Sequence, residues 1–81
     1  MTQKEMVKAY LERYGSITAM EGFNELGIVD LAGVIRNLIH DGYEINFKWI
    51  FKKNQFGHPI KFKRYLLPKV SFFQRLNNLL K

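Results

Sequence analysis

The amino-acid sequence predicts one small α+β domain in which three helices precede a two-stranded β-hairpin. Apolar residues recur with a helical period before residue 41 and with a period of two after residue 44. Gly27 separates two short helical segments at what should be a tight turn. The chain has 81 residues, of which 47% are hydrophobic, which suffices for one modest core.

The first helix is predicted to begin after Thr2 and to end at Gly15. The segment Thr2–Glu5 has the S/T-x-x-E pattern of a capping box, and Gly15 supplies a C-terminal stop. Ser16-Ile17 is long enough only for a small strand that pairs with the later hairpin. The apolar residues between these ends have the spacing of one buried helix face: Met6, Val7, Tyr10, Leu11 and Tyr14.

The second and third helices should form a helix-turn-helix unit. Thr18–Glu21 repeats the capping-box pattern and opens a helix that runs to about residue 26, and Gly27 makes the turn. Asp30 can cap the third helix, residues 31–40. The residues expected to face inward are Phe23, Leu26 and one of Ala19 and Met20, followed by Leu31, Val34 or Ile35, Leu38 and Ile39.

Two glycines interrupt these helices, Gly22 and Gly33, and each costs on the order of 1 kcal/mol relative to Ala. Close helix–helix packing is the favoured explanation for Gly22. For Gly33, packing and close approach of a ligand both remain open.

From Glu44 onward apolar and polar residues alternate, as in a half-buried antiparallel strand. A loop over residues 53–59 separates this run from a second one, in which Ile60 and Phe62 face inward. Trp49 and the neighbouring phenylalanines share the inward phase, so we expect them in the core and not stacked on bases. The outer face of the hairpin would then carry Lys48, Lys52, Lys61 and Lys63.

The domain is expected to span residues 1–67, with a separate amphipathic helix within residues 68–81. Ser71–Gln74 is a third capping-box pattern, and a lone helix of this length is unstable in water. Its apolar stripe should therefore pack on its own domain or on a second copy as a homodimer, while its few cations argue against a membrane surface. The stripe consists of Phe72, Phe73, Leu76, Leu79 and Leu80.

The net charge of +6 is concentrated in the C-terminal half. Residues 1–43 carry four basic and six acidic residues, a net charge of −2, whereas residues 44–81 carry nine basic residues and one acid, a net charge of +8. This asymmetry favours a polyanionic partner for the C-terminal half.

The composition offers no candidate for a catalytic, cofactor or metal site. There is no Cys, and His40 and His58 have no partner at ligand spacing. No apolar run approaches the ~18 residues of a membrane span. We therefore expect a non-enzymatic cytoplasmic protein, without a cofactor or a small-molecule substrate.

Five short motifs occur in order along residues 2–45: TQKEMVKAYL, GSIT, LGI, LAGVIRNL and DGYEI. In this order and spacing they resemble the small winged helix-turn-helix proteins of bacteriophages and mobile elements. The resemblance covers roughly residues 2–66 and leaves the last predicted helix outside. It implies binding to double-stranded DNA, with the third helix in the major groove and the hairpin wing on the backbone or minor groove.

The resemblance also implies which residues contact DNA. On the third helix Arg36 would read guanine and Asn37 adenine, although Val34 stands where such families often have a basic residue. Each phosphate that the wing contacts should make the plot of log K for DNA binding against log[salt] steeper by about 0.9. Several such contacts predict a slope of roughly −4 to −6. The candidates on the third helix are Asp30, Ala32, Gly33, Arg36, Asn37 and His40. Those on the wing are Lys48, Lys52, Lys53, Asn54, Gln55, His58, Lys61 and Lys63.

Two functions follow from these observations. The first is a DNA-binding regulator of transcription or architectural factor, which the +8 charge of residues 44–81 favours. The second is a protein-interaction module on the same scaffold, which the few base-reading groups of the third helix favour. Charge alone does not separate DNA from RNA.

Overall fold

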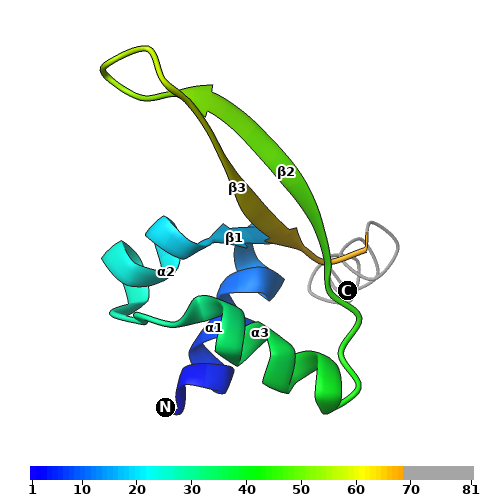
Figure 1. Ribbon diagram of the computed structural model, residues 1–81. Helices are drawn as coiled ribbons and strands as arrows, with labels where there is room; N and C mark the ends of the chain where they lie inside the picture. The colour runs from blue at the N-terminus through cyan, green and yellow to red at the C-terminus, as the bar shows by residue number, and fades with distance from the viewer. Residues whose placement is uncertain (69–81) are drawn as a thin grey trace.

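The computed structural model describes residues 1–68, which form three helices and a three-stranded antiparallel sheet (Figure 1). The predicted order of three helices followed by a β-hairpin is confirmed. The predicted C-terminal helix, with Phe72, Phe73, Leu76, Leu79 and Leu80, lies outside the described residues. The elements are α1 (Gln3–Tyr14), β1 (Ser16–Thr18), α2 (Ala19–Leu26), α3 (Leu31–His40), β2 (Asn46–Lys53) and β3 (Pro59–Leu66).

Side-chain caps begin all three helices where the sequence predicts them. In α1 and α2 the capping boxes are complete, and in each the Thr hydroxyl accepts from the backbone N–H of the Glu at 3.1 Å. The Asp30 carboxylate accepts from Gly33 N–H at 3.1 Å and so caps α3. Each cap satisfies a backbone donor that the helix itself leaves unpaired, which fixes where the helix starts.

The turn between α2 and α3 depends on Gly27, which has a φ of 70°. Its N–H donates to the carbonyl of Phe23, and the N–H of Ile28 donates to the carbonyl of Gly22, both at 3.0 Å. A residue with a Cβ pays roughly 1–2 kcal/mol in this left-handed region, so glycine suits the position. The turn brings Ile28 into the core.

The two glycines within helices have different explanations. Gly22 is buried against α3, where an added Cβ would lie 3.4 Å from Leu31 Cδ1, at the limit of ordinary contact, in agreement with the packing explanation. A Cβ on Gly33 would instead collide with the carboxylate of Asp30. Gly33 therefore makes room for the cap of its own helix, an explanation that the sequence did not suggest.

The core of the described residues lies where α1, α3 and β1 meet. Its buried apolar members are Val7, Leu11, Ile17, Ile28, Leu31, Val34, Ile35, Leu38 and Leu67. The side chains that were wrongly expected to face inward, and are exposed, are Tyr14, Ala19, Met20, Phe23 and Ile39. On α2 Gly22 is the buried residue and Leu26 is half-buried, and on α3 four residues already fill the buried stripe.

An exposed ion pair connects the start of α1 to the end of α3. Lys4 Nζ lies 2.6 Å from Asp41 Oδ2, and its ammonium holds the pKa of Asp41 below the ordinary value. Because both groups face solvent, the pair contributes little to stability. The pair nevertheless shows that the end of α3 lies beside the start of α1.

The small strand predicted at Ser16-Ile17 is present and extends to Thr18. The sheet order is β1-β3-β2, so β1 pairs with β3 and not with β2, the next strand in the sequence. Ile17 lies opposite Tyr65, and the paired segment ends where Thr18 lies opposite Arg64. Since β1 is only three residues long, the distal part of β3 has no partner on that edge among residues 1–68.

Candidate nucleic-acid interface

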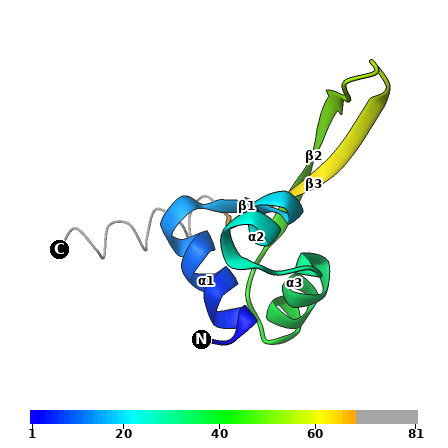
Figure 2. The same ribbon diagram turned by 90° about the vertical axis from the view of Figure 1, so that its left-hand side faces the viewer.

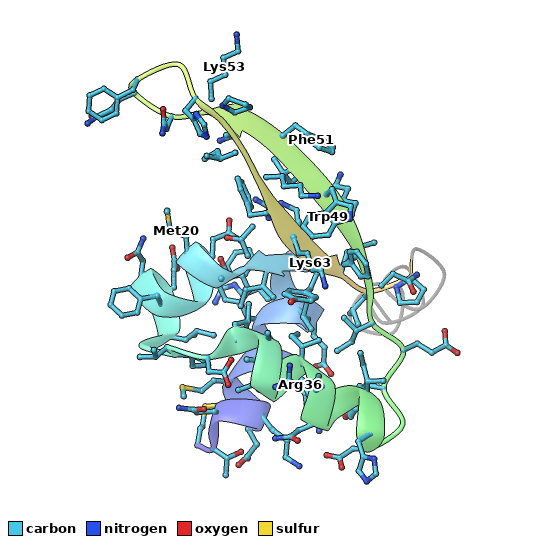
Figure 3. All side chains as sticks on the ribbon, viewed as in Figure 1. Met20, Arg36, Trp49, Phe51, Lys53 and Lys63 are labelled. Carbon is cyan, nitrogen blue, oxygen red and sulfur yellow. The ribbon has the colours of Figure 1, made fainter. Side chains whose placement is uncertain are left out.

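The exposed side of α3 carries the predicted recognition residues. Of these, Asp30, Ala32, Arg36, Asn37 and His40 are exposed, and Gly33 is half-buried. Arg36 extends from the outer surface of α3 in Figure 3. The Asp30 carboxylate already holds the N–H of Gly33, so its first role is structural. The polar groups that α3 can offer a ligand are therefore mainly those of Arg36, Asn37 and His40.

The wing consists of β2, β3 and the loop of residues 54–58 that joins them. It extends beyond the helices and leans toward the side on which α3 lies (Figures 1 and 2). Its charged residues are all basic, since no Asp or Glu occurs between residues 46 and 66. They are Lys48, Lys52, Lys53, Lys61, Lys63 and Arg64.

The pairing of β2 with β3 separates the lysines onto both faces of the wing. Residues directly opposite in an antiparallel pair lie on the same face. Lys61 lies opposite Phe51 and Lys63 opposite Trp49, whereas Lys48 lies opposite Arg64 and Lys52 opposite Ile60. The expectation that Lys48, Lys52, Lys61 and Lys63 share one outer face is therefore wrong.

The loop sets this register. The side-chain oxygen of Asn54 accepts from the N–H groups of Phe56 and His58, both at 2.9 Å, and Gly57 has a φ of 76°. A shift of one residue would move every side chain of a strand to the other face. The sequence shows the alternation within each strand, but it does not show which face of β3 meets which face of β2.

The aromatic side chains of β2 are exposed and not part of the core, contrary to the sequence prediction. The exposed fraction is 50% for Phe47, 43% for Trp49 and 74% for Phe51. The core ends near the base of the wing, at Ile17 and the half-buried Tyr65, and the rings farther out on this face are not part of it. We name Phe47, Trp49, Phe51, Lys61 and Lys63 the wing platform.

The two platform lysines lie over the platform rings. Lys61 Nζ is 4.7 Å from the centroid of Trp49, and Lys63 Nζ is 4.4 Å from that of Phe47 and 5.4 Å from that of Trp49. These are cation–π distances. Figure 3 shows Trp49 and Lys63 between the distal wing and Arg36 of α3. The platform thus combines ring surface and positive charge on one face.

Arg64 fixes the base of the wing against the helices. Its Nη1 donates to Ser16 Oγ and to Glu21 Oε1, both at 3.1 Å, and Glu21 is also part of the α2 capping box. The pair is about one-third exposed. The sequence analysis did not predict this contact. The signal for it was that Arg64 continues the alternation of Ile60 and Phe62, where a cation needs a partner.

A groove of about 730 Å³ runs between α2 and the wing. Met20 and Asn24 of α2 line one side of it, and Trp49, Phe62 and Lys63 of the wing line the other. The exposed Met20, labelled in Figure 3, therefore borders the wing platform.

The remaining wing candidates are at the surface. Asn54 is exposed, but its side-chain oxygen is already used to close the loop. Lys63 is half-buried, with its ammonium over the rings of Phe47 and Trp49. The other predicted wing residues are all exposed: Lys48, Lys52, Lys53, Gln55, His58 and Lys61.

Residues 1–68 contain neither a membrane-spanning helix nor a cluster of metal-binding side chains. None of the helices in this part of the chain is long and apolar enough to cross a membrane. Within the same residues, no group of three or more His, Cys, Asp or Glu side chains is placed to hold a metal ion.

Comparison with known proteins supports the fold. Neither the curated proteins nor the solved structures gave a match. A family model described as a winged helix-turn-helix domain matches residues 2–70. This fold suggests DNA binding, in agreement with the surface formed by α3 and the wing. The match covers most of the chain, which therefore belongs to the winged helix-turn-helix domain family.

Proposed function

We propose that this protein binds double-stranded DNA as a small transcriptional regulator or architectural factor of the type found in bacteriophages and mobile elements. One observation carries the proposal: the wing inclines to the side of the molecule on which α3 lies (Figure 2), α3 exposes Arg36 and Asn37, and the charged residues of the wing are all basic. Such a protein acts by occupying or shaping DNA, without chemistry or a cofactor, in the bacterial cytoplasm or nucleoid.

In this proposal α3 enters the major groove. An α-helix with its side chains is about 10–12 Å in diameter and the major groove is about 12 Å wide, so α3, with 10 residues and a length of about 15 Å, can lie in the groove. Arg36 and Asn37 then reach base edges or the adjoining phosphates. With few other base-reading groups on α3, most of the affinity comes from the phosphate backbone.

The wing supplies the backbone contacts. Lys53, Lys61 and Lys63 lie on the platform face, which continues the side of the sheet that packs on the core. Lys48 and Lys52 lie on the opposite face and reach phosphates only at the edge of the contact. Arg64 is held by Glu21 and orients the wing.

Replacing Arg36 by Ala tests the role of α3. Loss of one phosphate contact should weaken binding to a mixed-sequence duplex roughly eightfold at ~0.1 M salt, since each contact contributes about 0.9 to the salt exponent. Fluorescence anisotropy with a labelled duplex measures the change. The matched control is Arg13→Ala on α1, whose side chain lies beside Tyr14 outside the proposed surface.

An equal effect of the two arginine substitutions would show that α3 does not face the DNA. If neither substitution matters because no duplex binds at low salt, the alternative function applies, a protein-interaction module. The exposed rings of the wing are the observation that favours that alternative.

A further inference from the structure

We propose that the wing platform binds unpaired nucleic-acid bases, so that the protein holds DNA where a duplex adjoins an open strand. The inference rests on the proposed DNA-binding function and adds a second binding mode to it. It concerns the five side chains of the platform, which are Phe47, Trp49, Phe51, Lys61 and Lys63.

The exposure of the rings is the first observation. Phe47, Trp49 and Phe51 occupy alternate positions of β2 and therefore lie in a row on one face. Between 43% and 74% of each side chain is exposed. A row of exposed aromatic side chains costs solubility, and such patches commonly mark interaction sites.

The lysines between the rings indicate the chemistry of the partner. Lys61 and Lys63 lie directly across from Phe51 and Trp49, and the wing has no acidic residue. Lysine is depleted at protein–protein interfaces, whereas aromatic rings beside cations are typical of surfaces that bind single-stranded nucleic acid. The rings would stack on bases while the ammonium groups move onto the phosphates.

The geometry of the strand fits this use. Side chains two residues apart on a strand are separated by about 6.8 Å, so successive rings of the row can each offer a face to a different base. Phe47 and Trp49 meet edge to face, with an interplanar angle of 84° and 5.9 Å between their centroids. They do not stack on each other, so a base has a ring face to stack on.

The single Trp of the chain provides the readout, because stacking on a base quenches indole fluorescence. The full chain is titrated with three DNAs: a blunt duplex, the same duplex with a thymine overhang, and the same duplex with an abasic overhang. The two overhangs carry equal numbers of phosphates, so their difference isolates the bases. We expect the thymine overhang to bind at least fivefold more tightly than the abasic one and alone to quench Trp49.

Phe51→Ala should remove this preference, because the Phe51 ring is largely exposed and its loss leaves the core intact. The matched control is Phe23→Ala on α2, which removes a ring of comparable exposure outside the wing and should keep the preference. Sedimentation of both variants shows whether the platform instead contacts a second copy.

Three results would overturn the inference while leaving duplex binding in place. One is equal affinity for the thymine and abasic overhangs, with unchanged Trp49 fluorescence. Another is a Phe51→Ala variant that weakens blunt and overhang DNA to the same extent, which would indicate contact with the duplex. The third is a Phe51→Ala variant that loses self-association but keeps the overhang preference. Failure of the blunt duplex to bind would instead overturn the proposed function.

Discussion

Replacing Leu38 by Ala is expected to lower the free energy of unfolding by about 2–5 kcal/mol, because it leaves a cavity in a small core. Leu38 is 1% exposed and packs where α1 meets α3. Small domains are stable by only about 5–15 kcal/mol, so this loss is a large part of the total. Urea denaturation followed by circular dichroism measures it.

The neighbouring residue gives a matched control on the same helix. Ile39 is 48% exposed, so Ile39→Ala should change the free energy of unfolding by no more than about 0.5–1 kcal/mol. The comparison also tests which side of α3 is buried, since the sequence alone placed both residues inside. Equal losses for the two variants would mean that α3 is rotated relative to the structure described here.

Replacing both Lys61 and Lys63 by Ala is expected to weaken duplex binding roughly 60-fold at ~0.1 M salt. The estimate follows from the loss of two phosphate contacts at about 0.9 each in the salt exponent. These residues lie on the face of the wing that continues from the core-packing side of the sheet. Anisotropy titrations with a labelled duplex at several salt concentrations measure both the affinity and the exponent.

The double substitution Lys48→Ala and Lys52→Ala makes the same change in charge on the opposite face of the wing. It should weaken binding clearly less, since that face is turned away from the proposed contact. Equal losses would indicate attraction by net charge alone, without a defined docking face. A larger loss from Lys48 and Lys52 would place the DNA on the other side of the wing.

Most of the helical part of the fold was predictable because its signals are local. The caps at Thr2, Thr18 and Asp30 lie three residues from the N–H groups they accept from. The turn at Gly27 is likewise set by the conformation of one residue. The periodicity of α3 identified Leu31 and Leu38 as core residues.

The errors concern contacts between distant parts of the chain. Phe23 was expected inside because α2 has an apolar stripe, but Gly22 is the buried residue of α2 and Phe23 is 58% exposed. Similarly, Ile39 lies at the margin of a stripe that four other residues of α3 already fill. Periodicity identifies the apolar side of a helix, but how much of that side is covered depends on its neighbours.

The two strands of the wing were predicted correctly, but the side chains that share each of its faces were not. Both strands are present, but Ile60 and Phe62 were wrongly expected on the same inward face as Trp49. Ile60, which is 42% exposed, lies opposite Lys52, and Phe62 lies opposite Ile50, because the loop held by Asn54 decides which residues share a face. Trp49 was assigned to the core because apolar strand residues usually are, yet the core ends before this part of the wing. Arg64 bonds to Ser16 and Glu21 across more than 40 residues, a pairing that no local pattern encodes.

The salt dependence of duplex binding by the full chain tests the central claim most directly. Arg36, Lys53, Lys61 and Lys63 lie on the proposed contact side, and Lys48 and Lys52 lie at its edge. Four to six phosphate contacts predict a log K against log[salt] slope of roughly −4 to −5. A slope near zero, or no binding to duplex DNA at low salt, would contradict the account.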